Sequence, residues 1–371
     1  MYEDFWRIMT GKIFRRILIF AVIVIGLVVY LSLVFTFPRD QESDMARERF
    51  NSFYALPDNS LDAVIIGTSG VDRYWIPQLA WKEQGIATYG ITSGNQPLPF
   101  IKYMMAEAMK DHDIQTFIID IRAITKNPAK INDTDVRRVT DNMRLSSNRI
   151  KATQEIMSFL SSGKTKIKTD DISYYLRLAK YHSGWKDLSI KDLYDFYPES
   201  DYMGFFAYND NAFEIIPQKI TTVTRDTKSL NPRNEAALLD LLDYCDNIDA
   251  NIIFVSSPQS PNSLVQMRYN EAFRIIQSRG YKTINFNREE KYAELDWDFH
   301  HDMYNHGHAN IYGAVKYTRW LAEYLKKQCS LKDHRKDSDQ SKYAKWEDAY
   351  ENTMSRLKQF DKQYYREIYI K

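Results

Sequence analysis

The chain has 371 residues, of which 44% are hydrophobic, so it can bury one large core or two small ones, and disorder throughout is excluded. Its 50 Lys and Arg residues nearly balance 49 Asp and Glu residues, which leaves a formal net charge of +1. Because such a balance creates no global field to attract a polyanion, we expect no nucleic-acid partner.

The first predicted element is a membrane-spanning helix. Residues 17–37 form an uncharged apolar run, about 31 Å long as an α-helix, which matches the hydrocarbon core of a bilayer. Basic residues precede this run, so the positive-inside rule places residues 1–16 in the cytoplasm and the rest of the chain outside. A cleaved signal peptide is the rival interpretation, but the run is long for one and no small-x-small cleavage site ends it. The sequence therefore predicts a single-pass, membrane-anchored protein of the cell membrane whose main domain is extracellular.

A polar stalk is expected over residues 38–60, and beyond it short apolar runs alternate with amphipathic stretches. Five runs predict buried strands, over 62–67, 87–91, 116–121, 251–256 and 281–286. Helical patterns cover 97–110, 231–246, 261–279 and 310–327. This alternation predicts an α/β domain over residues 61–329, with a parallel sheet and helices on both of its faces.

Two further segments depart from this alternation. The interval between the third and fourth predicted strands is too long for an ordinary crossover and indicates an inserted cap over about residues 125–230. Residues 330–371 combine a charged linker with a weakly amphipathic helical tail. That tail either packs on its own domain, which the pattern favours, or docks a partner. The two cysteines, Cys245 and Cys329, either form a disulfide or remain free thiols.

Candidate site residues follow the first two predicted strands, where open α/β sheets bind their ligands. Residues 67–70, Gly-Thr-Ser-Gly, place the Ser69 hydroxyl in a tight turn before a helix, where backbone N–H groups can receive an oxyanion. The alternative is an ordinary turn or a helix N-cap. After the second strand, Gly94 allows close backbone approach while Asn95 and Gln96 supply amide donors, although the segment can also be a plain loop.

The most specific pattern begins at His308, at the start of the last predicted helix. Asn310 follows at +2 and Gly313 at +5, and this spacing resembles the last block of the SGNH (GDSL-like) hydrolases. The turn at 67–70 then resembles that superfamily's Gly-Asp-Ser block, with threonine in place of the usual aspartate. Gly94 falls where the superfamily's oxyanion-hole glycine lies.

The resemblance covers about residues 61–325 and implies a flavodoxin-like three-layer α/β/α sandwich of SGNH type. It also implies a Ser-His mechanism that requires no cofactor. In it, Ser69 is the nucleophile and His308 the general base, while Gly94, Asn95 and Gln96 contribute to the oxyanion and substrate site.

The third member of the catalytic triad is where the sequence departs from this superfamily. Its members place an aspartate three residues before the histidine, and Asn305 occupies that position here. Asp302 is the nearest alternative carboxylate. An Asp-x-x-His pair also occurs at Asp298 and His301, but His301 lacks the following glycine, and we interpret this pair as a coincidence.

The stretches 94–98 and 117–122 further resemble a membrane-anchored branch of the superfamily, typified by the D-alanine transfer protein of lipoteichoic-acid synthesis. Members of that branch often work beside a multipass membrane O-acyltransferase. The resemblance implies an envelope-surface acyl esterase or O-acyltransferase, with a cell-envelope glycopolymer such as a teichoic acid, or an acyl donor, as its partner. The alternative is a catalytically weak or inactive module that binds a glycopolymer or scaffolds a membrane O-acyltransferase.

A histidine-rich segment between residues 298 and 308 also suggests a metal site. Its possible ligands are His300, His301, His306 and His308 with Asp298 and Asp302. Since no predicted helix holds two of these histidines four residues apart, and exposed histidine runs are usually solvated, we expect no metal.

Overall fold

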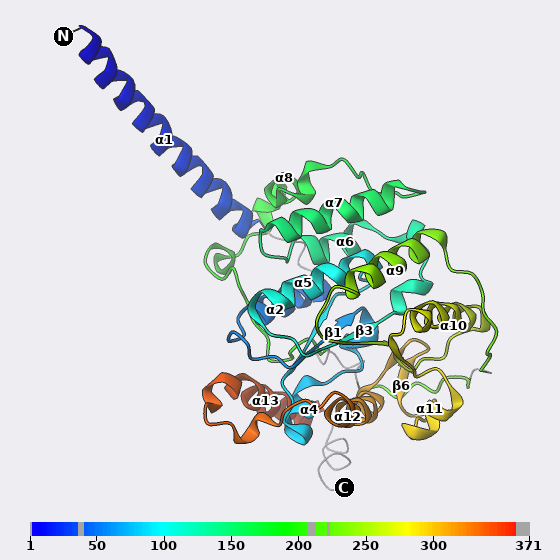
Figure 1. Ribbon diagram of the computed structural model, residues 1–371. Helices are drawn as coiled ribbons and strands as arrows, with labels where there is room; N and C mark the ends of the chain where they lie inside the picture. The colour runs from blue at the N-terminus through cyan, green and yellow to red at the C-terminus, as the bar shows by residue number, and fades with distance from the viewer. Residues whose placement is uncertain (1, 36–40, 206–212, 221–222, 361–371) are drawn as a thin grey trace.

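The core of the molecule is a five-stranded parallel sheet with helices on both faces (Figure 1). The structure is a computed structural model that describes residues 2–35, 41–205, 213–220 and 223–360. Its sheet contains β1 (Ala63–Gly67), β2 (Thr88–Thr92), β3 (Thr116–Asp120), β4 (Asn251–Ser256) and β5 (Lys282–Asn285). The predicted α/β class and the five predicted strands are confirmed, because these short apolar runs are buried by helices on either side.

The strands lie in the order β2-β1-β3-β4-β5, which is the doubly wound order whose switch point falls between β1 and β3. In the register of the sheet, Gly67 at the end of β1 pairs with Thr92 at the end of β2. On its other side β1 pairs with β3, Ala63 opposite Thr116. The carboxyl ends of these three strands therefore meet at one edge of the sheet, where the predicted site residues begin.

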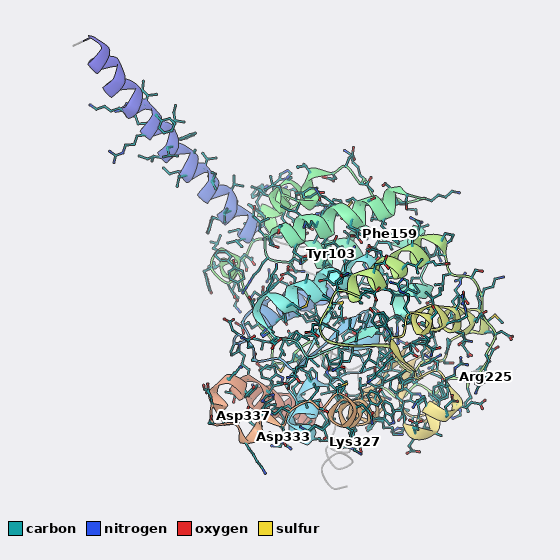
Figure 2. All side chains as sticks on the ribbon, viewed as in Figure 1. Tyr103, Phe159, Arg225, Lys327, Asp333 and Asp337 are labelled. Carbon is teal, nitrogen blue, oxygen red and sulfur yellow. The ribbon has the colours of Figure 1, made fainter. Side chains whose placement is uncertain are left out.

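Side chains of alternate strand residues enter two separate cores. Val64 and Ile66 face the first core, and Ala63 and Ile65 face the second. The first core is covered by α5 (Ile101–Asp111), α7 (Ser147–Ser161), α9 (Pro232–Cys245) and α10 (Ser263–Ser278). The second is covered by α4 (Pro77–Gln84), α11 (Glu289–Glu294) and α12 (Ile311–Gln328). Tyr103 and Phe159, labelled in Figure 2, mark α5 and α7 on the first side.

The two cysteines lie in different cores, which decides whether they can form a disulfide. Cys245 belongs to the first core and Cys329 to the second. Both are buried free thiols. The sheet between them keeps the two sulfur atoms apart, so they form no disulfide in this structure.

The N-terminal helix α1 (Tyr2–Val34) projects away from the domain (Figure 1). Its segment Gly11–Val34 has a mean hydropathy of 3.1 and is long and apolar enough to cross a membrane. The predicted span of 17–37 lies within this helix up to Val34, and residues 36 and 37 lie outside the described residues. Its last turns meet the domain, where the Tyr30 ring packs edge-on against Phe196 with centroids 5.9 Å apart.

The predicted stalk over 38–60 is wrong, because this segment contains a helix that is part of the domain. Helix α2 (Gln41–Tyr54) packs against β2 and buries Phe50 and Phe53. Its apolar residues recur at helical spacing, but they lie within a strongly charged segment. The high mean polarity of the segment therefore conceals its amphipathic helical pattern. The guanidinium of Arg49 forms a buried ion pair with Asp72, Nη1 to Oδ2 3.1 Å.

The inserted segment lies beside the sheet and contains α6 (Asp133–Thr140), α7 and α8 (Arg177–Tyr181). It returns to the free edge of β2, where the N–H of Gly90 donates to the carbonyl of Met203 at 3.0 Å. Gly204 has a φ of +95°, and a Cβ there would lie 2.1 Å from the Gly90 carbonyl oxygen. Only glycine fits this contact, which closes the edge of the sheet.

The C-terminal segment also packs on the domain. Helix α13 (Ala344–Phe360) lies against α4 and places Trp346 in the first core. The indole Nε1 of Trp346 donates to the carbonyl of Thr88 at 3.1 Å. Ahead of this helix, His334 Nε2 lies 2.8 Å from Asp62 Oδ1. Of the two interpretations of the tail, packing on its own domain is the one that the structure shows.

The burial of Trp346 predicts that the tail contributes strongly to stability. Trp346→Ala should lower the free energy of unfolding by about 3–5 kcal/mol, since it leaves a large cavity and an unpaired carbonyl. Glu351→Ala, on the exposed face of the same helix, is the matched control. The measurement is denaturant unfolding of the full chain in detergent, and equal midpoints for the two variants would contradict the prediction.

Candidate active site

Ser69 lies in the turn that follows β1. It is the first residue of the short helix α3 (Ser69–Asp72), which Thr68 caps by accepting a hydrogen bond from the N–H of Gly70. The Ser69 side chain is half-buried. The backbone N–H of a first helical residue has no partner within the helix, so that of Ser69 is available to a ligand. The hydroxyl of Thr92 donates to the Thr68 carbonyl at 2.9 Å and joins this turn to the end of β2.

A small hairpin brings His308 to Ser69. Its strands, β6 (Met303–Asn305) and β7 (His308–Ala309), are antiparallel and pair Asn305 with His308. The Nε2 atom of His308 lies 2.7 Å from Ser69 Oγ, and its Nδ1 atom lies 3.0 Å from Asn305 Oδ1. The three side chains form a continuous hydrogen-bonded chain, Asn305 to His308 to Ser69.

The direction of this chain follows from a second contact of Asn305. Its Oδ1 atom also accepts a hydrogen bond from the N–H of Gly307 at 2.9 Å, which identifies that atom as the amide oxygen. An oxygen can only accept, so His308 Nδ1 carries the hydrogen and Nε2 presents its lone pair to the Ser69 hydroxyl. This is the tautomer that a general base for Ser69 requires.

Three side chains hold the His308 hairpin in place. The carbonyl of Gly307 accepts hydrogen bonds from Arg122 Nη1 at 2.5 Å and from the Tyr74 hydroxyl at 3.0 Å. The ring of Tyr304 stacks on the imidazole of His308, with centroids 5.5 Å apart and planes inclined by 12°. The imidazole is therefore fixed in position as well as in tautomer.

A buried carboxylate, Asp120 at the end of β3, connects these groups. Its Oδ1 accepts from the N–H of Arg122 at 2.9 Å, and its Oδ2 accepts from both the N–H and the hydroxyl of Ser257 at 3.2 Å. The same carboxylate packs against the turn of Ser69. A Cβ on Gly70 would lie 2.5 Å from Asp120 Oδ2, which explains why glycine follows the serine.

Positive charge surrounds the imidazole. Burial, together with repulsion of a proton by Arg122, Arg73 and Lys126, lowers the pKa of His308 to about 2. Burial and the charge of Arg122 also lower the pKa of Lys126, to about 8. The imidazole is thus neutral, its protonation is disfavoured, and the surrounding field favours negative charge on a bound group.

The structure does not bring Asp302 to His308, so the hypothesis that this carboxylate orients the imidazole is wrong. Asp302 is buried and accepts from the N–H of Asp298 and from Lys316 Nζ, both at 2.8 Å. It also lies 2.9 Å from His301 Nδ1. These contacts direct the Asp302 carboxylate away from His308, which leaves Asn305 as the residue that orients the imidazole.

The segment after β2 lies at the same sheet edge as Ser69. Gly94 is half-buried, and Asn95 is exposed with a φ of +56° and accepts a hydrogen bond from Lys126 Nζ through its Oδ1. Gln96 is buried, and within the described part of the chain neither polar atom of its side chain has a hydrogen-bond partner. A buried amide in this state is a candidate contact for a substrate.

The other residues of the last motif have structural roles. Asn310 caps α12 by accepting from the N–H groups of Tyr312 and Gly313 at 3.1 and 3.2 Å. A Cβ on Gly313 would lie 2.3 Å from the Asp302 carbonyl, so the helix approaches the hairpin closely only with glycine there. These two residues fix the position of the helix that follows His308.

The histidine-rich segment does not converge on one point. His300 lies near Asp298, with 3.7 Å between Nδ1 and Oδ1, whereas His301 contacts Asp302 and His308 contacts Ser69. Among the residues that the structure describes, no group of three or more His, Cys, Asp or Glu side chains could hold a metal ion.

Sequence reasoning missed most of the groups that support His308. Arg122 follows β3 at the edge of the sheet where ligands bind, and this position could have identified it as a site residue. Nothing in the local sequence distinguishes Tyr74, Tyr304 or Arg73 from the many other aromatic and basic residues.

Comparison with known proteins adds no assignment, since no protein-family model, curated protein or solved structure matches the chain. The geometry of Ser69, His308 and Asn305 is therefore the ground on which a function is inferred.

The lowered pKa of His308 predicts an unusual pH dependence for a reaction of Ser69. The base is active when neutral, so its activity is lost only as the pH falls through its pKa, which lies well below the ordinary value of about 6.5. Labelling of Ser69 by a fluorophosphonate should thus persist below pH 6. Arg73→Gln removes a repelling charge and should move this acid limb to higher pH, whereas Arg73→Lys should not. An acid limb near pH 6.5 in the wild type would contradict the prediction.

Proposed function

We propose that the chain is a serine ester hydrolase or O-acyltransferase of SGNH type. The observation that carries this proposal is the 2.7 Å contact between Ser69 Oγ and His308 Nε2, with the opposite ring nitrogen directed at Asn305. The site lies at the carboxyl edge of a doubly wound sheet, as ligand sites in such sheets do. The resemblance of residues 67–70 and of the segment from His308 to Gly313 to SGNH motifs supports the same class.

In the proposed reaction, His308 Nε2 takes the hydroxyl proton as Ser69 Oγ forms a bond to the acyl carbonyl carbon. The backbone N–H groups of Ser69 and Gly94 stabilise the oxyanion, with Gln96 as a further donor. Collapse of this intermediate breaks the ester bond, and the leaving alkoxide takes the proton from His308. Water or an acceptor hydroxyl then attacks the acyl-serine by the reverse sequence, giving hydrolysis or transfer.

The charges around the site act on two stages of this reaction in opposite directions. Arg122, Arg73 and Lys126 favour the oxyanion, but they also oppose the imidazolium that forms as Ser69 is deprotonated. Asn305 holds the imidazole in place without a compensating negative charge. We therefore expect a slower reaction than that of an Asp-containing triad.

The anchor gives the proposed enzyme its location. The basic residues before the apolar run favour a cytoplasmic N-terminus, which places Ser69 outside the cytoplasm. There the substrates would be acyl esters of a cell-envelope glycopolymer such as a teichoic acid. A multipass membrane O-acyltransferase is the partner that the resemblance suggests.

A second candidate function is that of a non-catalytic module that binds a glycopolymer or scaffolds such an acyltransferase. The observation in its favour is Asn305, since the amide supplies orientation without charge. The two candidates differ in whether Ser69 is nucleophilic.

The nucleophile is tested by Ser69→Ala. This change should abolish labelling by a fluorophosphonate and leave the thermal midpoint within a few degrees, because one half-exposed hydroxyl contributes only about 0.5–1.5 kcal/mol. The matched control is Ser341→Ala, at an exposed serine of the tail. Labelling that survives in Ser69→Ala, or no labelling of the wild type, would favour the non-catalytic module.

The third position is tested by Asn305→Asp. A carboxylate at 305 retains both acceptor contacts and adds a charge that stabilises the imidazolium, so the labelling rate should rise by about 10- to 1000-fold. This is part of the 10⁴-fold that serine proteases lose in the reverse change. Asn305→Ala should reduce the rate.

Asp302→Asn is the control for these variants, since it removes a carboxylate that does not contact His308. It should change the labelling rate little at constant fold, as judged by circular dichroism. A large loss in Asp302→Asn with no response to Asn305→Asp would assign the orienting role to Asp302 after all.

A further inference from the structure

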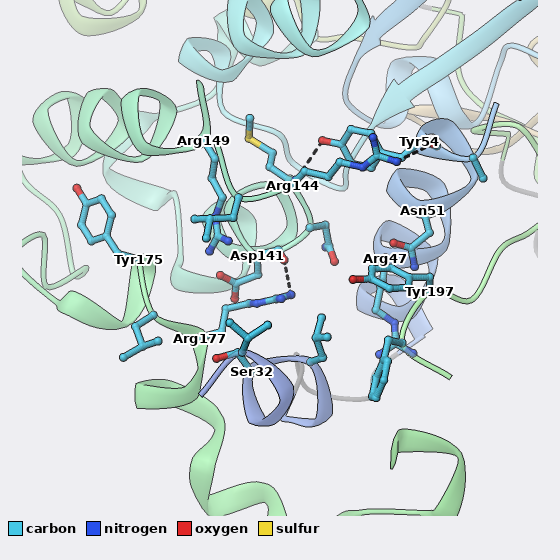
Figure 3. A pocket seen from close by; sticks show the side chains of 18 of the residues that line it. Ser32, Arg47, Asn51, Tyr54, Asp141, Arg144, Arg149, Tyr175, Arg177 and Tyr197 are labelled. Atoms are coloured by element: carbon cyan, nitrogen blue, oxygen red, sulfur yellow. Dashed lines mark hydrogen bonds between the residues drawn. The ribbon is translucent and has the colours of Figure 1, made fainter. Parts of the chain in front are cut away.

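A large cavity lies where the C-terminal end of α1 meets α2 and the inserted segment (Figure 3). Its volume is about 740 Å³. We call it the juxtamembrane cavity, and its charged lining comprises Arg47, Arg144, Arg149, Arg177, Asp141 and Glu199. It is separate from the Ser69 site, and none of the residues that hold His308 line it.

The charges in the juxtamembrane cavity are unbalanced in favour of cations. Four arginines line it against two carboxylates. One of these, Asp141, is buried, accepts a hydrogen bond from the Tyr181 hydroxyl at 2.8 Å and lies 3.7 Å from Arg137. Arg137 does not line the cavity, so part of the negative charge of Asp141 is already neutralised from behind. Arg144 is likewise offset by Asp111, which lies outside the lining at 3.6 Å from its Nη1 atom. The lining keeps an excess of cations and is suited to an anion.

Two of the arginines repel each other inside the cavity. Arg149 is buried, and burial together with the charge of Arg177 lowers its pKa. Arg177 is held by a hydrogen bond from Nη1 to the carbonyl of Asp141 at 2.7 Å, as Figure 3 shows. A bound anion between the guanidiniums would relieve this repulsion and would find donors already in place.

Arg144 completes the cationic wall from the opposite side. Its guanidinium lies over the ring of Tyr54, 4.3 Å from the centroid, and its Nη2 donates to the Tyr54 carbonyl at 2.8 Å. Its side chain is 58% exposed, so a substitution there should not disturb the core. This residue is the one best suited to a charge-altering variant.

The other wall of the cavity is apolar and belongs to the membrane helix. Val28, Val29 and Leu33 of α1 contribute it. These residues lie in the last two turns of the candidate span Gly11–Val34, so the cavity reaches about 9 Å below the end of the span. At that depth the surroundings of a membrane helix are acyl chains.

Exposed apolar and aromatic side chains beside α1 support the placement of the juxtamembrane cavity next to the bilayer. Trp185, Ile190, Tyr194 and Tyr197 are all exposed in the part of the inserted segment that contacts α1. That contact includes a hydrogen bond from the Tyr30 hydroxyl to the Leu193 carbonyl at 3.4 Å. Exposed tryptophan and tyrosine next to a membrane helix are typical of the bilayer interface, where the rings find both apolar and polar surroundings.

We propose that the juxtamembrane cavity binds the phosphate headgroup of an anionic phospholipid from the leaflet at the C-terminal end of α1. The phosphate lies among Arg144, Arg149 and Arg177, and the acyl chains lie along Val28, Val29 and Leu33. Recognition combines charge-assisted hydrogen bonds with burial of the chains, so both parts of the lipid are needed.

The test measures thermal protection of the full chain in neutral detergent. Short-chain phosphatidylglycerol should raise the thermal midpoint in a saturable way, whereas short-chain phosphatidylcholine, which carries no net charge, should not. Inorganic phosphate is the third ligand and separates a lipid site from a soluble-phosphate site. Equal protection by phosphatidylcholine, or by phosphate at the same concentration, would overturn the proposal.

Substitutions of arginine test whether the phospholipid binds in the juxtamembrane cavity. Arg144→Gln should weaken phosphatidylglycerol binding at least tenfold, and Arg144→Glu should weaken it more. Arg274→Gln, at an exposed arginine on α10, removes the same charge elsewhere and should leave binding unchanged. Unchanged binding in Arg144→Glu would overturn the assignment. Ser69→Ala should bind the lipid like the wild type, so the result is independent of the proposed chemistry.

Discussion

The arrangement of the candidate active site depends on one buried carboxylate. Asp120 ends the central strand β3 and accepts hydrogen bonds from Arg122 and Ser257, while its oxygens lie against Gly70 in the turn of Ser69. Arg122 in turn holds the Gly307 carbonyl next to His308. A buried carboxylate is stable only when its acceptors are satisfied, so the hydrogen bonds and packing of Asp120 fix Ser69 on one side and His308 on the other.

The site combines a strongly positive field with an uncharged orienting residue. Three cations near His308 disfavour its protonated form, and Asn305 offers nothing to offset them. The same cations would stabilise an oxyanion or an anionic substrate group. In the proposed reaction, the site is thus organised around negative charge on the ligand, and proton transfer to His308 is the costly step.

The strands could be predicted from sequence because each is a short apolar run between polar segments. Ser69 and His308 could be proposed because they stand at the ends of such elements in a spaced pattern. The choice between Asp302 and Asn305 could not be made, since it depends on a hairpin that pairs Asn305 with His308 and on Lys316, which engages Asp302. Helix α2 was missed because charged residues conceal its apolar face, and Tyr74 and Arg122 act through contacts between residues distant in sequence.

The packing of α2 onto the sheet limits how the domain can move relative to α1. A catalytic domain on a flexible linker changes its distance and orientation relative to the membrane, so it can reach substrates at many distances from the surface. Here α2 is joined to α3, the helix that begins with Ser69, by the ion pair of Arg49 with Asp72, and Tyr30 of α1 contacts Phe196 of the inserted segment. These contacts hold Ser69 in one position relative to α1. In the proposed reaction, the substrate would therefore have to bring its ester groups to Ser69.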